Sequence, residues 1–237
     1  MQGIGIFNDA GFEVHTRDKN ADIIYVSPSH MTRWGDVMSN KRRLELVEYS
    51  FNNNSTVIED DYENDFMYNV KPTPALFTLG HGNVIYIGSF SAMLLPGIRI
   101  SFMVLNDELT KLYNQNKYKF AQTASKTEQI ALCQYIRDGH INSQTRKIRR
   151  LYSNKTKDFY SILKKEFPNA QISISENTLQ IIMSVKFDKD IEVFEKSSIS
   201  LFVEKYENGL ITIVLSPSGI PSSKLLEGAK TLRKAIE

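Results

Sequence analysis

Apolar and polar residues alternate in short blocks along the first half of the chain. Four apolar runs end in polar loops; they are ADIIYVSP, STVIEDDY, NVIYIGSF and RISFMVL, at residues 21–28, 55–62, 83–90 and 99–105. Near-continuous apolar runs are typical of strands that are buried on both faces. Because helical segments separate them, the order predicts a largely parallel α/β sheet with right-handed crossovers.

A helix is predicted in the segment KRRLELVEYSF, between the first two runs. Ser39 and Asn40 precede it and are residue types that cap helix N-termini. Leu44, Val47 and Phe51 recur at helical spacing and are expected to form its buried face.

The second half of the chain begins with helical spacing, from about residue 106 to residue 167. SKTEQIALCQYIRDGH predicts a helix that ends near Gly139, and the segment INSQTRKIRRLYSNKTKDFYSILKKEF predicts a long helix that ends before Pro168. We interpret the basic residues of the long helix as a solvated face, with contact to DNA as the alternative.

Four strand-like runs, QISIS, LQIIMSV, ISLFVEKY and LITIVLS, precede a last helix in SSKLLEGAKTLRKAIE. Ser222 or Ser223 is expected to cap this helix. Strands followed by a terminal helix predict a small α+β domain. We therefore expect a partial large domain at residues 1–120, connecting helices at 121–167 and a small C-terminal α+β domain at 168–237.

The 237 residues are 41% hydrophobic and carry a formal net charge of +2, which gives no strong electrostatic reason to expect binding to nucleic acid or membrane. Cys133 is the single cysteine and lies in an apolar stretch, so we expect a buried thiol and a reducing, cytoplasmic environment. The N-terminus does not resemble a signal peptide, and no apolar run is long enough to span a bilayer.

Polar clusters follow three of the predicted strands: SPSH, EDDY and GSFSA. In open α/β sheets, ligands bind beyond the carboxyl ends of the strands, so the three clusters are expected to share one crevice. The IEDDY segment could bind a metal, pair with a cationic heterocycle, act in acid–base chemistry, or be an acidic surface loop. No further ligands at metal-binding spacing are evident, and no metal site is expected.

The stretch GSFSAMLLPGIRIS, at residues 88–101, has the composition of an anion-binding loop. The hydroxyls of Ser89 and Ser91, the loop N–H groups and the guanidinium of Arg99 could together hold a phosphate. The alternative is a turn with a surface arginine. The position where a reactive side chain would be sought is Ala92.

Together, IEDDY and GSFSxxLLPGxRIS, with YVSPSH and VMSNKRRLELVEY upstream, resemble the aminotransferase-like domain of the MocR branch of GntR-type transcription regulators. The resemblance implies the α/β fold of type I pyridoxal 5'-phosphate (PLP) aminotransferases, with a mostly parallel sheet in the large domain and a small C-terminal α+β domain. It also implies that the chain is incomplete at its N-terminal side, where the family carries a winged helix-turn-helix domain and the front of the large domain.

The resemblance also implies roles for site residues. Asp60 would face the pyridinium nitrogen of PLP, and Tyr62 would hydrogen-bond its ring oxygen. Three residues would hold the phosphate: Ser89, Ser91 and Arg99. His30 would lie beside the cofactor ring, or it is a structural histidine.

The sequence departs from the family pattern at several positions, two of which carry assigned roles in the family. The Schiff-base lysine of the family falls at Ala92, and an alanine methyl group can neither bind PLP covalently nor carry a proton. The arginine that binds a substrate carboxylate aligns with Asn208. PLP binding is therefore expected to be non-covalent and weak or absent.

The resemblance favours a non-catalytic domain that senses an amine or amino-acid effector and forms a homodimer. DNA binding would belong to the winged helix-turn-helix domain absent from this chain. One alternative is a PLP-dependent aminotransferase whose lysine has been replaced, and another is a degenerate scaffold.

Overall fold

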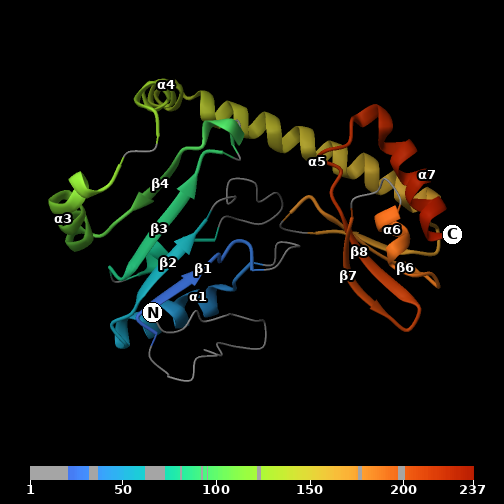
Figure 1. Cartoon of the computed structure of the whole chain (residues 1–237), viewed down its shortest axis with the longest axis horizontal. Helices are drawn as coiled ribbons and strands as arrows, with labels where there is room; N and C mark the ends of the chain where they lie inside the picture. Colours follow the sequence, from blue (N-terminus) through green and yellow to red (C-terminus); the bar gives the residue numbers. More distant parts are fainter. Residues whose placement is uncertain are drawn as a thin grey trace. The chain divides into compact units, whose positions relative to one another are not determined.

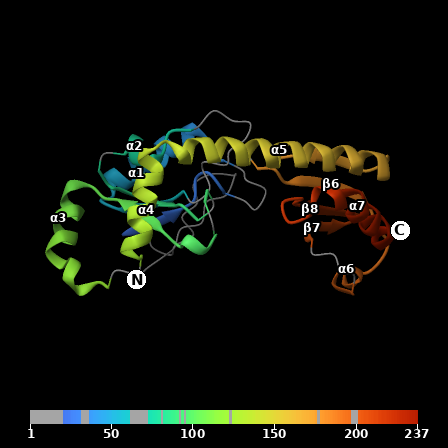
Figure 2. The ribbon, with the colours of Figure 1, turned by 90° about the horizontal axis from the view of Figure 1, so that it is seen from above.

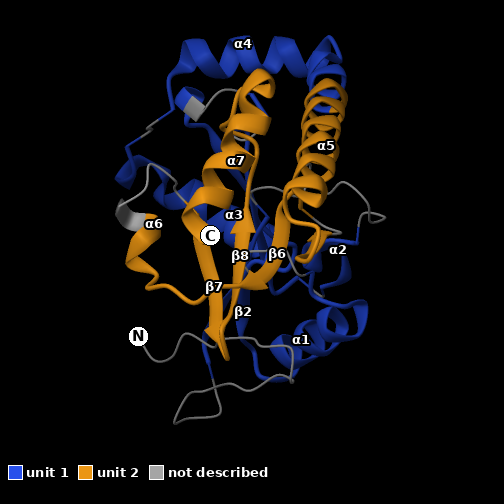
Figure 3. Cartoon of the chain, turned by 90° about the vertical axis from the view of Figure 1, so that its right-hand side faces the viewer, with its two compact units in different colours: residues 1–145 blue, residues 146–237 orange. Residues whose placement is uncertain are grey.

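The computed structural model describes residues 21–31, 37–61, 73–80, 82–91, 93–94, 96–121, 124–175, 178–196 and 201–237. The chain forms two compact units, Met1–Thr145 and Arg146–Glu237 (Figure 3). The three-part division at residues 120 and 167 stays a prediction. Within the described ranges, no helix has the length and apolar character needed to cross a membrane.

The first unit contains a four-stranded sheet in the order β1-β2-β3-β4 (Figure 1). Its strands are β1 (Ile23–Val26), β2 (Thr56–Asp60), β3 (Val84–Ser89) and β4 (Ser101–Val104). The first three strands are parallel, and β4 runs antiparallel to β3. The four strands and the mostly parallel sheet agree with the prediction from the sequence.

Helices α1 (Asn40–Asn52) and α2 (Leu76–Leu79) pack against one face of this sheet, which we call the inner face. Ile24, Val57 and Val84 are buried there. On the opposite, outer face, Ile23 and Tyr25 of β1 are 54% and 47% exposed. The expectation that the strands are buried on both faces is therefore wrong for β1, which alternates between exposed and buried residues. It is also wrong for β4, whose four residues are all exposed.

Helix α1 buries a different set of side chains from the set expected. Ser39 caps it as predicted, since its hydroxyl accepts the N–H of Arg42 at 3.3 Å. Leu44 and Phe51, however, are 55% and 57% exposed. The buried residues are Arg43, Leu46, Val47 and Ser50. The buried face of α1 differs from the predicted face because the prediction used apolar residues only, whereas the buried face includes an arginine.

Three helices follow the first sheet: α3 (Asp107–Asn116), α4 (Lys126–Arg137) and α5 (His140–Glu166). Helix α4 ends before Gly139, as predicted, and the φ of 74° at Gly139 lies in the left-handed region that glycine adopts readily. Helix α5 ends before Pro168, also as predicted. Figure 2 shows α5 as one uninterrupted helix. Cys133 is exposed, so the expected burial of its thiol is wrong. Leu132 is the buried residue of α4.

The second unit contains an antiparallel sheet in the order β5-β6-β8-β7. Its elements are β5 (Gln171–Ile174), β6 (Ile181–Lys186), α6 (Glu192–Lys196), β7 (Phe202–Glu207), β8 (Leu210–Leu215), the 3-10 turn η4 (Ser222–Lys224) and α7 (Leu225–Ile236). Leu163 of α5, Ile213 of β8 and Ala229 of α7 share its core. This arrangement matches the predicted strands followed by a helix.

Ser222, Ser223 and Asn208, which figure in two of the predictions, all lie in turns of the second unit. Ser222 and Ser223 lie in η4 and neither is the cap of α7, which starts after Lys224 without a side-chain cap, so that prediction is wrong. Asn208 and Gly209 form the turn between β7 and β8, with φ values of 53° and 71°. Asn-Gly with two positive φ values is a favoured hairpin turn, so turn geometry accounts for asparagine at position 208.

Candidate functional site

Three polar side chains gather at the carboxyl ends of β1, β2 and β3. Tyr25 pairs with Ile58, and Asp60 pairs with Ile87. Because side chains alternate along strands, Tyr25, Asp60 and Ser89 all lie on the outer face. The structure thus brings Asp60 and Ser89 to one edge of the sheet, as the sequence predicts.

The Asp60 carboxylate is held by a residue that the sequence analysis missed. The phenol of Tyr25 donates a hydrogen bond to Asp60 Oδ2. Asp60 is half-buried, so its carboxylate remains accessible while one oxygen is oriented. The signal for Tyr25 in the sequence is weak, because a tyrosine in a β-strand is ordinary.

Asp60 and Asp61 diverge although they are adjacent in the chain. Asp61 is 5% exposed, and its Oδ2 accepts the phenol O–H of Tyr86 at 2.9 Å. Glu59, two residues before Asp61, is fully buried on the inner face. The two aspartates therefore cannot chelate one ion together, and only Asp60 faces the candidate site.

The loop after β3 folds back on itself. The hydroxyl of Ser89 accepts the N–H of Ser91 at 3.2 Å. The N–H of Phe90 donates to the carbonyl of Ile100 at 3.0 Å, which closes the loop. Arg99 follows the short 3-10 helix Pro96–Ile98 and has a φ of 46°, a conformation uncommon for a residue with a side chain. This geometry brings the start and the end of the predicted phosphate loop together.

Gly88 and Phe102 fix the base of this loop. A Cβ atom on Gly88 would lie 2.4 Å from Cζ of Phe102, so no larger residue fits without displacement of the ring. The Phe102 ring also packs against Phe90, with centroids 5.2 Å apart. The glycine therefore leaves room for the Phe102 ring to lie over β3 where the loop begins.

The remaining predicted residues divide into two groups. His30 lies in the turn after β1, where its N–H donates to the carbonyl of Ser27 at 3.0 Å. Tyr62 and Ala92 lie outside the described residues. Their predicted roles therefore rest on the sequence motifs.

A buried arginine connects the segments around the site, and the sequence analysis missed it. Arg43 of α1 is 1% exposed. Its guanidinium donates to three carbonyls at 3.1 Å each: those of Pro28, Met38 and Pro74. Pro28 belongs to the turn that carries His30. The signal in the sequence was the helical position of Arg43. It lies three and four residues before the buried Leu46 and Val47, and therefore on the same side of α1.

Glu59 is the carboxylate partner of this arginine. Its Oε1 lies 3.7 Å from Arg43 Nη1, and both side chains are buried. Its two oxygens also accept the N–H groups of Leu76 and Phe77, at 2.9 and 3.0 Å. Because Asp60 follows Glu59 directly, this buried pair fixes the strand end that presents the candidate carboxylate.

Burial has the largest effect on the Glu59 carboxyl and raises its pKa above the ordinary value of 4.5. The hydrogen bonds from Leu76 and Phe77 and the charge of Arg43 oppose the rise, and the charge of Asp61 adds to it. Glu59 therefore takes up a proton at a higher pH in the folded chain than in the unfolded chain.

This raised pKa predicts a pH-dependent difference between the native chain and Glu59→Gln. Between pH of about 4.5 and the raised pKa, the folded state binds more protons, so native stability relative to Glu59→Gln increases as pH falls. One proton limits the change to about 1.4 kcal/mol per pH unit. Urea denaturation of both proteins at neutral and mildly acidic pH measures it. A constant difference, or one that shrinks with acid, would contradict the assignment.

The chain matches the sequence profile described as aminotransferase class I and II over residues 13–213. It is 30% identical over 229 residues to the uncharacterized HTH-type transcriptional regulator YdeL of Bacillus subtilis, covering 92% of this chain and 50% of YdeL. It is 27% identical over 228 residues to the probable rhizopine catabolism regulatory protein MocR of Rhizobium meliloti, covering 90% and 45%. The chain thus spans about half the length of these regulators.

Solved structures with a similar fold include aminotransferases. The kynurenine aminotransferase of Pyrococcus horikoshii superposes with a TM-score of 0.71 at 23% identity, covering 91% of this chain and 56% of that one. The α-aminoadipate aminotransferase LysN of Thermus thermophilus gives a TM-score of 0.70 at 23% identity, covering 90% and 58%. At this identity the likeness concerns the fold alone.

Proposed function

We propose that this chain, which belongs to the family of class I and II aminotransferases, is the ligand-sensing domain of a MocR-type transcription regulator, because it is similar to YdeL and MocR. The predicted type I PLP aminotransferase fold and the predicted similarity to MocR-type regulators are both confirmed. One observation supports the proposal: Asp60 and Ser89 lie at the same ends of neighbouring strands, ahead of a loop in which the motif resemblance assigns the family's lysine position to Ala92.

The side chains of this edge fit PLP. The Asp60 carboxylate, oriented by Tyr25, can pair with a protonated ring nitrogen. The hydroxyls of Ser89 and Ser91 and the guanidinium of Arg99 suit a phosphate, because charge-assisted hydrogen bonds to phosphate are strong. When bound, PLP supplies an electron-withdrawing ring and a reactive carbonyl.

Residues known from the motifs complete the proposed site. Tyr62 would hydrogen-bond the ring oxygen of PLP, and His30 would lie beside the ring. The methyl group of Ala92 offers neither an amine for attachment nor a group that moves a proton. We therefore propose weak, non-covalent binding, in which PLP or its adduct with an amine or amino acid acts as the signal.

The proposed partners follow from the regulators to which the chain is similar. YdeL is named as an HTH-type transcriptional regulator. We propose that a helix-turn-helix domain outside this chain binds DNA, and that the present fold supports a homodimer. The second candidate function is that of an aminotransferase with a replaced lysine, which the fold of the kynurenine aminotransferase favours.

The cofactor assignment predicts that Asp60→Asn weakens PLP binding by about 10- to 100-fold, since a hydrogen bond to a charged group is worth about 1.5–3 kcal/mol. Equilibrium dialysis of PLP against the native chain and the variant measures the ratio. Asp22→Asn is the matched control, because Asp22 is exposed and precedes β1 in the same unit. Equal loss in both variants, or no saturable binding by the native chain, would overturn the assignment.

A further inference from the structure

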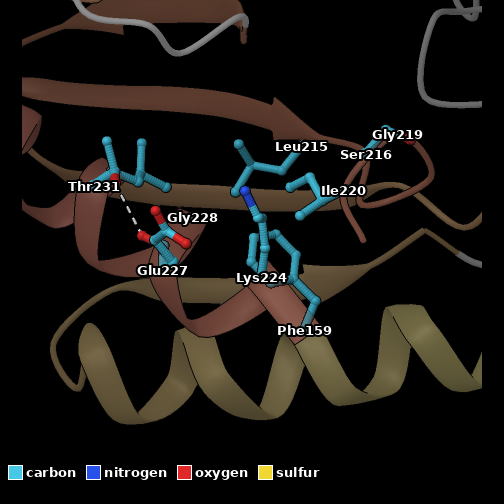
Figure 4. Close-up of a pocket in the computed structure, with 10 residues that line it drawn as sticks. Phe159, Leu215, Ser216, Gly219, Ile220, Lys224, Glu227, Gly228 and Thr231 are labelled. Atoms are coloured by element: carbon cyan, nitrogen blue, oxygen red, sulfur yellow. Dashed lines mark hydrogen bonds between the residues drawn. The ribbon is translucent and has the colours of Figure 1, made fainter. Parts of the chain in front are cut away.

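The second unit contains a cavity of about 450 Å³ between α5, the end of β8 and α7 (Figure 4). Phe159, Leu215 and Ile220 give it an apolar wall, and Lys224 and Glu227 lie at its polar side. All of its lining residues belong to the second unit. None of them belongs to the motifs that carry the proposed PLP site.

The loop that forms one wall of this cavity is held by four hydrogen bonds. Within it, the hydroxyls of Ser216 and Ser218 form a hydrogen bond of 2.9 Å. The N–H of Ile220 donates to the carbonyl of Pro217 at 3.0 Å. Lys155 of α5 donates to the carbonyl of Ser218 at 2.9 Å. The N–H of Lys224 donates to the carbonyl of Pro221 at 2.8 Å. A wall fixed in this way lowers the ordering cost of binding a small ligand.

A glycine on α7 keeps the cavity open. Gly228 lies within the first turns of the helix, where glycine is unfavourable by about 1 kcal/mol relative to alanine. A Cβ atom there would meet Cδ1 of Ile220 at 3.7 Å, an ordinary contact. A longer side chain at this position would therefore occupy the cavity without strain in the backbone.

Two opposite charges border the cavity without neutralising each other. Lys224 and Glu227 are both exposed and stand three residues apart at the start of α7. Among the residues that the structure describes, neither forms an ion pair. In Figure 4 the Lys224 side chain reaches between Phe159 and Leu215, and Glu227 lies beside Gly228.

We propose that this cavity binds a free α-amino acid with an apolar side chain. The ligand carboxylate lies at Lys224, its ammonium group lies at Glu227, and its side chain packs against Phe159 and Leu215. A simple carboxylate would face Glu227 with a like charge, and a simple amine would face Lys224 with a like charge. A zwitterion satisfies both groups, and the volume suits a small molecule.

Calorimetric titration of the full chain with L-leucine, in the absence of PLP, tests this site. We expect one saturable site, and we expect Lys224→Met and Glu227→Gln each to weaken binding by about tenfold or more. Gly228→Leu is expected to abolish binding because its side chain fills the cavity. Lys230→Met is the matched control, because Lys230 is an exposed lysine of α7 that does not line the cavity.

Further titrations separate this site from the proposed PLP site and test the charge argument. Asp60→Asn is expected to leave L-leucine binding unchanged, so failure of the PLP assignment and failure of this proposal remain distinguishable. 4-Methylpentanoate and isopentylamine, which each lack one of the two charged groups, are expected to bind at least about tenfold more weakly. The proposal is overturned by absence of saturable L-leucine binding, by equal binding of either analogue, or by full binding to Gly228→Leu.

Discussion

Replacement of Arg43 by methionine is expected to destabilise the first unit by about 3–5 kcal/mol, because it leaves the buried Glu59 carboxylate without its cation. Three carbonyls that accept hydrogen bonds from the guanidinium would also lose their donor. Water cannot replace the lost interactions, since the Arg43 and Glu59 side chains are only 1% and 0% exposed. A loss of this size is a large fraction of the roughly 5–15 kcal/mol by which a typical domain is stable.

Urea denaturation measures this effect, and Arg42→Met is the matched control. Arg42 is the preceding residue on α1 and pairs with Glu45 at 2.6 Å, but its side chain is 36% exposed. Its loss is expected to cost less than about 1 kcal/mol. The double variant Arg43→Met with Glu59→Gln is expected to recover part of the loss, because it removes the uncompensated charge. Similar losses for the two arginines would contradict the buried-pair account.

Replacement of Leu163 by alanine is expected to destabilise the second unit by about 2–5 kcal/mol, through lost burial and the cavity it leaves. Leu163 is 0% exposed and belongs to the core formed by α5, β6, β8 and α7. The same substitution at Leu151, which is 59% exposed on the same helix, is expected to change stability by less than about 0.5 kcal/mol.

Chemical denaturation of these two leucine variants provides the comparison, with L-leucine absent so that ligand binding does not contribute. Helix propensity affects both substitutions alike, since both residues lie within α5. A large loss for Leu151→Ala or a negligible loss for Leu163→Ala would show that the core of the second unit is not the one described.

The repeating pattern of apolar residues was enough to predict the main elements of both units. The ends of α4 and α5 followed from Gly139 and Pro168, because these residues terminate helices for local reasons. The burial of α1 did not follow, since Arg43 is stabilised by carbonyls from three separate segments. Such contacts depend on tertiary structure and leave no periodic signal.

The candidate site was predictable only in part, because some of its contacts also depend on tertiary structure. Asp60, Ser89 and Arg99 were proposed as site residues because their sequence context resembles a family motif. The role of Tyr25 depends on the register between β1 and β2, which places its phenol against Asp60. The divergence of Asp60 and Asp61 likewise became clear only once the strand register was known.

The most direct test of the central claim is peptide mass mapping after one equivalent of PLP and borohydride, which makes a lysine–PLP linkage permanent. The native chain is compared with Ala92→Lys. We predict that the native chain gains no stoichiometric label in the peptide spanning residues 88–101, whereas Ala92→Lys gains one PLP there. Stoichiometric labelling of the native chain at another single lysine, or no labelling of Ala92→Lys, would contradict a PLP site that has lost only its lysine.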